Sequence, residues 1–282
     1  EEELGVEFDY AEPKQVADYE VIMRDMCDSG EYEVIVCISY DQQDGLSRVA
    51  PDYPDQKFAL IDGYVEGENI ASYACRENEG AYLVGVLAAL MKQDAETYGL
   101  ENNHKYGFVG AMDIALMHRF AAGYQAGVQY IDPEGEVDMQ YVGGDNPYAD
   151  TTTAKEIANS QFSKGCDIIF HAAGGSGLGV FTAAAESDFI AIGCNSNQNV
   201  LDPEHIAASM LKKVDNLAFD IVKGAVEGTL ALGQEVILGV AEDGIGYTIE
   251  ETAVPVSEDI IKQVEEIRVK IAEGEIEVPD AF

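Results

Sequence analysis

Short apolar runs rich in valine and isoleucine alternate with longer amphipathic stretches along most of the 282-residue chain. This alternation is typical of repeated βα units around mostly parallel sheets, so the sequence predicts an α/β fold. The expected strands cover residues 33–39, 57–62, 106–110, 138–142, 167–172 and 189–194. The expected helices cover about residues 79–92, 114–130, 152–164, 180–187 and 206–227.

The length of the chain indicates about two domains, each large enough to bury its own core. The polar segment 93–105 (QDAETYGLENNHK) contains few apolar residues and separates two groups of expected strands. We therefore expect this segment to run over the surface between two lobes. No apolar run approaches the roughly 18 residues that a membrane-spanning helix needs.

The charge of the chain is strongly negative, with 53 acidic against 16 basic side chains and a formal net charge of -37. Such a chain repels phosphate backbones and anionic lipid surfaces, so nucleic acid is not expected as a partner. The acidic residues are scattered and do not form one tail. This distribution favours a highly solvated, salt-adapted surface over a dedicated cation-binding role.

The cysteines and histidines do not indicate a metal site or a disulfide framework. The five cysteines, Cys27, Cys37, Cys75, Cys166 and Cys194, are too few and too far apart for either, and we expect buried thiols. The four histidines are equally dispersed, and no HExxH-like spacing occurs. No metal is therefore expected.

The most conspicuous local motif is GGSGLG, from Gly174 to Gly179, which follows an expected strand and opens an expected helix. Backbone N–H groups and the helix dipole at such a place can meet a polar ligand. The dinucleotide fingerprint GxGxxG fails, however, because Val180 stands where its last glycine belongs. Asn195 also stands where the acidic partner of that motif is expected.

Signals of catalysis are equally weak. A dehydrogenase-like Tyr-x-x-x-Lys spacing occurs at Tyr10 and Lys14, but Pro13 between them argues against a helix. No GxSxG elbow occurs, and no carboxylate pair stands out as an acid/base couple. We expect neither catalytic residues nor a cofactor, and so not an enzyme.

Several longer motifs occur together and in order, and they carry a family resemblance. They are HAAGGSGLGVFTAA (171–184), VGAMDIALMHRFAAGYQAG (109–127) and ASMLKKVD (208–215), supported by YPDQKFALID (53–62), ENEGAYLVGVLAAL (77–90), EDGIGY (242–247) and GEIEVP (274–279). The chain resembles the basic membrane protein family of substrate-binding lipoproteins over essentially its whole length.

The resemblance implies a type I periplasmic-binding-protein fold, with two doubly wound parallel-sheet lobes and a ligand cleft between them. We expect lobe I to hold residues 1–104 and 206–232, and lobe II to hold residues 105–198 and 236–282. Residues 199–205 and 233–235 would then be crossovers, which makes three crossings with the 93–105 segment. The family's opening strand and its Asp-Lys-Ser-Phe-Asn-type loop do not occur before Glu1. The expectation is that the numbered sequence omits an N-terminal portion.

Candidate ligand-binding residues follow from strand ends and from the resemblance. In open α/β sheets ligands sit beyond the carboxyl ends of strands, which selects Tyr40, Asp113, Gly174, Gly175 and Asn195. The resemblance implies ligand contacts for Asp113, Gly175 and Lys212, and we expect Asp113 and Lys212 to meet only when the lobes close. Tyr40 either stacks on a base or packs within its own lobe.

The resemblance also implies a function. The chain is similar to purine nucleoside receptors, which implies an extracytoplasmic receptor that delivers a nucleoside to ABC permease subunits. Its only membrane attachment would be a lipid anchor upstream of residue 1. Two alternatives stay open: an NAD(P)-dependent oxidoreductase, and a ligand-sensing regulatory module on the same fold.

One further departure bears on the ligand. The family typically has aspartates at the places of Asn195 and Asn197. Asparagine gives up charge-assisted hydrogen bonds, each of which contributes roughly 1.5–3 kcal/mol. The contacts to ribose hydroxyls, and with them the ligand class, therefore stay open at this stage.

Overall fold

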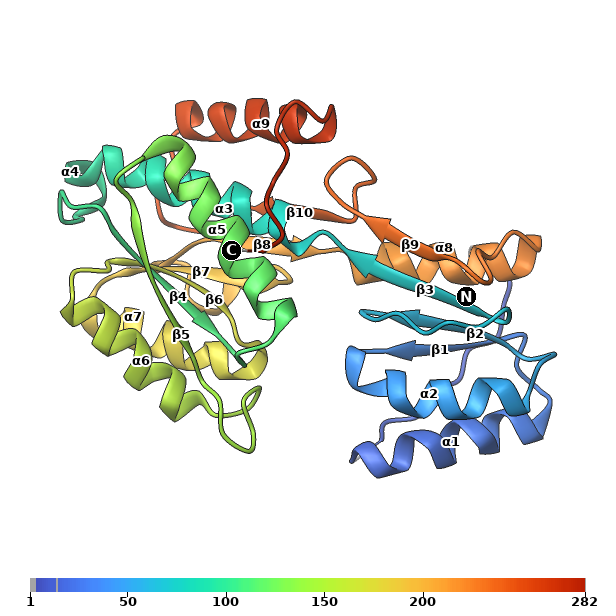
Figure 1. Ribbon diagram of the computed structural model, residues 1–282. Helices are drawn as coiled ribbons and strands as arrows, with labels where there is room; N and C mark the ends of the chain where they lie inside the picture. The colour runs from blue at the N-terminus through green and yellow to red at the C-terminus, as the bar shows by residue number, and fades with distance from the viewer. Residues whose placement is uncertain (1–3, 14, 282) are drawn as a thin grey trace. The chain divides into compact units, whose positions relative to one another are not determined.

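The computed structural model describes residues 4–13 and 15–281 of the chain, and it contains two separate β-sheets (Figure 1). The chain divides into two compact units. The first unit comprises Glu1–Cys75 and Val214–Leu238, and the second comprises Arg76–Lys213 and Gly239–Phe282. The chain therefore passes from one unit to the other three times.

The first unit contains a sheet of four parallel strands in the order β1-β2-β3-β9. Its elements are α1 (Val16–Ser29), β1 (Val34–Ile38), η1 (Tyr40–Gln42), α2 (Gln43–Val49), η2 (Ala50–Asp52), β2 (Lys57–Ile61), β3 (Ile70–Cys75), α8 (Val214–Glu227) and β9 (Glu235–Leu238). Phe58 and Leu60 of β2 belong to one buried cluster with Met23 of α1 and Leu46 of α2. Helix α8 contacts β1 and β2, so both faces of the sheet are covered.

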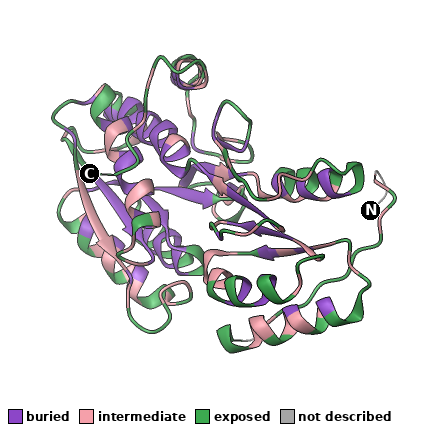
Figure 2. Cartoon of the chain, turned by 45° about the vertical axis from the view of Figure 1, so that its right-hand side comes forward, coloured by how far each residue is buried: buried purple, intermediate pink, exposed green. Residues whose placement is uncertain are grey.

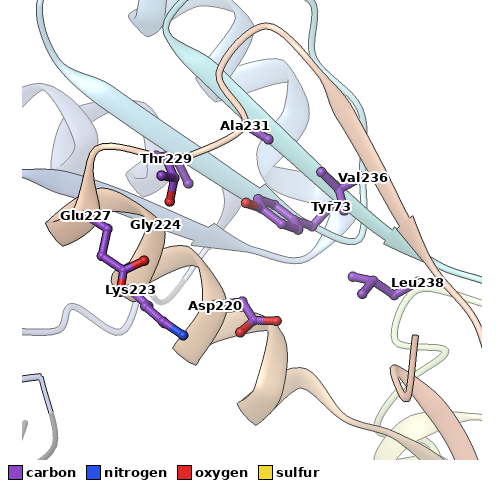
Figure 3. Close-up of a pocket in the computed structure, with 10 residues that line it drawn as sticks. Tyr73, Asp220, Lys223, Gly224, Glu227, Thr229, Ala231, Val236 and Leu238 are labelled. Atoms are coloured by element: carbon purple, nitrogen blue, oxygen red, sulfur yellow. The ribbon is translucent and has the colours of Figure 1, made fainter.

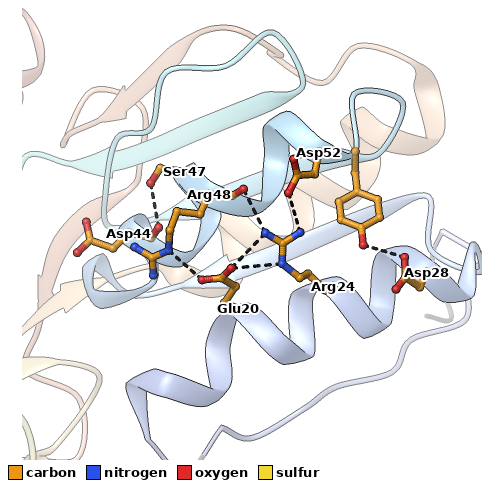
Figure 4. Close-up of polar contacts among 8 residues, drawn as sticks. Glu20, Arg24, Asp28, Asp44, Ser47, Arg48 and Asp52 are labelled. Atoms are coloured by element: carbon orange, nitrogen blue, oxygen red, sulfur yellow. Dashed lines mark hydrogen bonds and ion pairs between the residues drawn. The ribbon is translucent and has the colours of Figure 1, made fainter.

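Charged side chains connect α1 and α2 at the surface of the first unit (Figure 4). The Glu20 carboxylate accepts hydrogen bonds from Arg24, at 3.1 Å, and from Arg48, at 2.8 Å. Arg24 also donates to Asp52 at 2.8 Å. Exposed ion pairs of this kind contribute at most about 1 kcal/mol each, so burial and not charge holds these helices.

The second unit contains a sheet of six strands in the order β10-β8-β7-β6-β4-β5, of which only β10 is antiparallel to its neighbour. Its strands are β4 (Lys105–Gly110), β5 (Glu136–Tyr141), β6 (Ile168–Ala172), β7 (Ile190–Asn195), β8 (Ile206–Lys212) and β10 (Ile245–Thr248). Its helices are α3 (Glu77–Gln93), α4 (Ala95–Tyr98), α5 (Ala115–Ile131), α6 (Thr151–Ser163), α7 (Leu178–Ser187) and α9 (Glu258–Ala272), with the short η3 (Gly174–Gly177) and η4 (Asn199–Leu201). Helices α3 and α5 pack together on one face, and α6 and α7 on the other (Figure 1).

Glycines allow α3 and α5 to approach closely. A Cβ atom on Gly123 would lie 2.1 Å from the carbonyl oxygen of Asn78, and one on Gly127 would lie 2.1 Å from that of Tyr82. No side chain fits there without moving the backbone of the other helix. Buried residues accordingly run along nearly all of α3, as they do in the central strands β4, β6 and β7 (Figure 2).

The predicted α/β class and its parallel sheets are confirmed. All expected strands are present, with bounds that differ by one or two residues. The expected helix 206–227 is wrong in its first third, because Ile206–Lys212 is strand β8 and α8 begins at Val214. Strands β3, β9 and β10 and helices α1, α2 and α9 were not expected.

The boundaries of the two units differ from the expected lobes. Residues 76–104 and 206–213 pack in the second unit instead of the first. Two contacts explain the difference: β8 pairs with β7, and the buried Lys92 at the end of α3 forms an ion pair with Asp167. The 93–105 segment therefore connects α3 to β4 inside one unit. The two strand groups 33–62 and 106–195 do lie in separate sheets, as expected.

All five cysteines are buried, and none of them forms a disulfide. Within residues 4–13 and 15–281, no helix is both long and apolar enough to cross a membrane.

Candidate ligand-binding site

Three non-glycine residues with left-handed backbone stand at strand carboxyl ends. Ser39 (φ 103°) follows β1, Asp62 (φ 72°) follows β2, and Asn195 (φ 70°) ends β7. Such conformations cost about 1–3 kcal/mol each and tend to occur at functional sites. Because β1 and β2 pair in register up to Ile38 and Ile61, Ser39 and Asp62 are neighbours in the first unit.

The first unit also contributes Tyr40 and Asp41 at this edge. Tyr40 opens η1 and is half-buried. The Asp41 carboxylate accepts a hydrogen bond of 2.6 Å from the Tyr19 hydroxyl, and this bond is the main cause that raises the pKa of Tyr19 to about 12. Neither Asp41 nor Asp62 is among the candidates predicted from the sequence, although each is a polar residue just past an apolar strand.

In the second unit Asp113 follows β4 and contacts a histidine. His118 Nε2 lies 2.6 Å from Asp113 Oδ1, and the side chains are 39% and 75% exposed, respectively. The His118 ring meets the Tyr141 ring edge-on at 5.9 Å. Burial, and then the charge of Asp113, raise the pKa of Tyr141. This group offers solvent a carboxylate acceptor beside a histidine.

Lys212 lies at the end of β8, but its ammonium group is buried against an acid. Its Nζ lies 2.8 Å from Glu77 Oε1, and Arg119 Nη1 lies 3.4 Å from the other oxygen of Glu77. Asp113 and Lys212 thus belong to the same unit. We expected Asp113 and Lys212 to meet only when the lobes close, because the sequence placed Lys212 in lobe I. The structure places Lys212 in the second unit, together with Asp113, so the reason for that expectation is wrong. Glu77 carries no local sequence signal that marks it as the partner.

The glycine loop packs tightly against the segment that precedes α6. A Cβ atom on Gly175 would lie 2.9 Å from the Tyr148 carbonyl oxygen, and Gly174 has a left-handed backbone (φ 54°). The Ser176 N–H donates to the same carbonyl at 3.0 Å, and its hydroxyl donates to the Pro147 carbonyl at 2.8 Å. Packing within the unit therefore already requires Gly174 and Gly175. Their bare backbone could also approach a ligand.

Asn195 and Asn197 stand where the family typically has aspartates, and the structure explains one of these two differences. Asn195 is exposed, whereas the Asn197 amide donates a 3.0 Å hydrogen bond to the carboxylate of Glu251. A second carboxylate at position 197 would face Glu251 with like charge. Asn197 is therefore matched to its own neighbour, and only Asn195 remains as a difference at the solvent-facing edge.

A cavity of about 310 Å³ lies in the first unit, and none of the six selected residues lines it (Figure 3). It lies between α8 and strands β3 and β9 and is lined by Tyr73, Asp220, Lys223, Gly224, Glu227, Thr229, Leu230, Ala231, Val236 and Leu238. Burial, and then the charge of Asp220, raise the pKa of Tyr73. Ligands of open α/β sheets bind beyond the carboxyl ends of the strands, where the strained polar groups lie, so we rank the strand ends above this cavity.

Comparisons with known proteins find relatives that match nearly the whole chain. The chain is 31% identical over 290 residues to a CD4+ T-cell-stimulating antigen of Listeria monocytogenes, covering 97% of this chain and 77% of that protein. It is 26% identical to the ABC transporter nucleoside-binding protein BmpA of Lactococcus lactis, covering 98% of this chain and 79% of that protein.

A solved structure also matches nearly the whole chain. An ABC transporter solute-binding protein from Aeropyrum pernix matches 99% of this chain and 86% of its own, with a TM-score of 0.83 and 32% identity. The sequence profile described as "ABC transporter substrate-binding protein PnrA-like" matches residues 1–281. The chain therefore belongs to the Bmp family of PnrA-like ABC transporter substrate-binding proteins.

Proposed function

We propose that this protein is an extracytoplasmic receptor that binds a nucleoside and delivers it to an ABC permease without changing it chemically. Family membership supports the receptor role, and the name of the Lactococcus lactis relative supports the ligand class. The observation that carries the proposal is the placement of polar, strained groups at the strand ends of both units.

Each unit by itself offers contacts of a kind that a nucleoside can make. The exposed carboxylate of Asp113 can accept hydrogen bonds from ribose hydroxyls, as the amide oxygen of Asn195 can. The ring of Tyr40 can stack on a base. A neutral ligand is favoured over an anionic one, because the chain carries a formal net charge of -37.

The glycine loop supports a receptor over an NAD(P)-dependent oxidoreductase. A dinucleotide needs bare backbone N–H groups and open space for its pyrophosphate. Here the Ser176 N–H already donates to the Tyr148 carbonyl, and a Cβ atom on Gly179 would lie 2.0 Å from the Thr151 carbonyl oxygen. The loop is closed by α6 and the segment before it.

Two measurements test the proposal. Mass spectrometry of small molecules released from the purified protein should detect a nucleoside. Calorimetric titration with inosine, guanosine and adenosine should show binding of at least one, with a single site per chain. If the folded protein releases no nucleoside and binds none of the three, the ligand belongs to another class.

A further inference from the structure

His171 is a buried histidine at the end of β6, directly before the glycine loop, and it is 1% exposed. Its Nδ1 atom accepts a long hydrogen bond of 3.4 Å from the Ala173 N–H. Its Nε2 atom lies 3.0 Å from the side-chain carbonyl of Gln198. Because a backbone N–H can only donate, the ring proton belongs on Nε2, which then donates to Gln198.

Gln198 carries this connection to the turn that holds Asn195. Its side-chain carbonyl also accepts a 2.7 Å hydrogen bond from the Cys194 N–H. The backbone N–H of Gln198 donates to the Ser209 hydroxyl at 3.0 Å, and that hydroxyl donates to the side-chain oxygen of Asn199 at 2.7 Å. A continuous line of hydrogen bonds therefore joins Ala173, directly before the glycine loop, to the Asn195 turn and strand β8.

Packing holds both side chains in place. A Cβ atom on Gly177 would lie 2.1 Å from the His171 ring, so the loop closes onto the imidazole itself. The Phe181 ring meets this imidazole edge-on at 5.0 Å. A Cβ atom on Gly193 would lie 2.9 Å from the Gln198 side-chain oxygen. These close contacts restrict the rotamers open to the His171 ring and to the Gln198 side chain.

Burial also keeps the imidazole neutral, because it lowers the pKa of His171 to about 4. The ring therefore keeps one donor and one acceptor nitrogen at neutral pH, and it can serve both partners at once. Neither His171 nor Gln198 needs to touch a ligand for this purpose.

We propose that His171 and Gln198 are a pair of positioning residues that fix the glycine loop relative to the Asn195 turn, and that this spacing sets ligand affinity. The effect on affinity rests on the proposed function, whereas the coupling between the two loops is a property of the ligand-free protein. The two parts are therefore tested separately.

The first test uses the ligand-free full chain and amide NMR. We expect Gln198→Leu, which removes the shared carbonyl, to shift the amide signals of Gly174 and Gly175 as well as those of its own turn. Reciprocally, His171→Phe should shift the amides of Cys194 and Asn195. His171→Gln, which can both donate and accept, should restore signals close to those of the parent.

Gln161→Leu is the matched control. Gln161 is fully buried in the same unit, but it donates to the Phe108 and Asp138 carbonyls at 2.9 and 2.8 Å, away from both loops. It should lower stability without moving either set of loop signals. If His171→Phe does not fold, the Gln198→Leu shifts at the glycine loop decide the matter. Shifts confined to each variant's own loop would overturn the proposal.

The second test is a double-mutant cycle on ligand affinity, with whichever of inosine, guanosine and adenosine the parent binds. Each single variant should bind about tenfold more weakly, and the double variant no more weakly than either one. His171→Gln should recover most of the affinity, which a loss of fold stability alone would not predict. Additive losses, or equal losses in Gln161→Leu, would contradict a positioning role. If the parent binds none of the three, the nucleoside proposal fails, and the NMR result still decides whether the pair couples the loops.

Discussion

The Lys212 ammonium lies 2.8 Å from the Glu77 carboxylate, and the two side chains are only 5% and 2% exposed. Arg119 approaches the second oxygen of the same carboxylate, at 3.4 Å. Water is thus largely replaced by protein around both charges at the end of β8. Under the nucleoside-receptor proposal, any contact of Lys212 with a ligand would be made by a lysine that an internal acid already holds in position.

Breaking this buried pair should be costly. We expect Lys212→Met to lower the free energy of unfolding by about 3 kcal/mol, at the low end of the range for a broken buried pair, because Arg119 still faces Glu77. Urea unfolding is the measurement. Lys262→Met is the control, since Lys262 and Glu266 are 3.9 Å apart and 75% and 60% exposed, and it should cost less than about 1 kcal/mol. Equal losses in the two variants would show that the Lys212 pair contributes little.

The sequence predicted the strands well and the long-range polar contacts poorly. Strands such as Phe58–Ile61 are continuous apolar runs, and burial on both faces makes that pattern visible. The good helix formers in IAASMLK favour helix over Ile206–Lys212, but pairing with β7 overrides that preference. The partners of Lys212 and His171 could not be predicted, because Glu77 is 135 positions away and Gln198 is 27 positions away.

The candidate site was predicted only in part. The strand-end rule predicts Asn195, where the backbone is strained, and Tyr40, next to the strained Ser39, but it misses Asp62 on the neighbouring strand. It read the glycines of the loop as space for a ligand, whereas Tyr148 takes up part of that space. A role in ligand binding stays a prediction for all six residues.

His171 should make stability depend on pH. Burial lowers its pKa from the ordinary 6.5 to about 4, so below pH 6.5 the unfolded chain binds a proton that the folded chain does not. The contribution of neutral His171 to the free energy of unfolding is complete above pH 6.5 and is lost as the pH falls to about 4. It amounts to roughly 3 kcal/mol. The free energy of unfolding of the parent minus that of His171→Gln should fall over this window. The carboxylates titrate in both proteins, so their effect cancels in this difference. If the difference in the free energy of unfolding stays constant over the window, His171 is not buried as neutral imidazole.

Salt should stabilise the fold. With a formal net charge of -37, the folded chain repels itself, and screening weakens this repulsion. The melting temperature should therefore rise between low and near-molar potassium chloride. Glycine betaine at matched osmolality is the control for effects other than charge screening. A flat melting temperature in potassium chloride would show that the acidic residues are too well dispersed to matter.

The contact between α3 and α5 should not tolerate a methyl group. Gly123→Ala places a Cβ atom 2.1 Å from the Asn78 carbonyl oxygen, and overpacking of this kind costs about 1–3 kcal/mol. Gly246→Ala is the control, because no atom lies within 4 Å of its added Cβ atom. Thermal unfolding of both variants is the measurement. If Gly123→Ala is as stable as Gly246→Ala, the two helices can separate at little cost.

The last prediction concerns Asp113, whose side chain is 75% exposed and whose removal should leave the fold intact. If its carboxylate accepts hydrogen bonds from ligand hydroxyls in a partly desolvated site, Asp113→Asn should lose roughly 1–3 kcal/mol of binding, or about 5- to 150-fold in affinity. Calorimetric titration with inosine, guanosine and adenosine measures the loss.

Asp188→Asn is the matched control, because that side chain is fully exposed in the same unit and follows α7 at the opposite end of the helix from the glycine loop. Because His118 lies 2.6 Å from Asp113, His118→Gln should lower the affinity as well, by less than Asp113→Asn does. A parent that binds a nucleoside while Asp113→Asn binds it equally well would remove Asp113 from the site and leave its contact with His118 as a surface hydrogen bond.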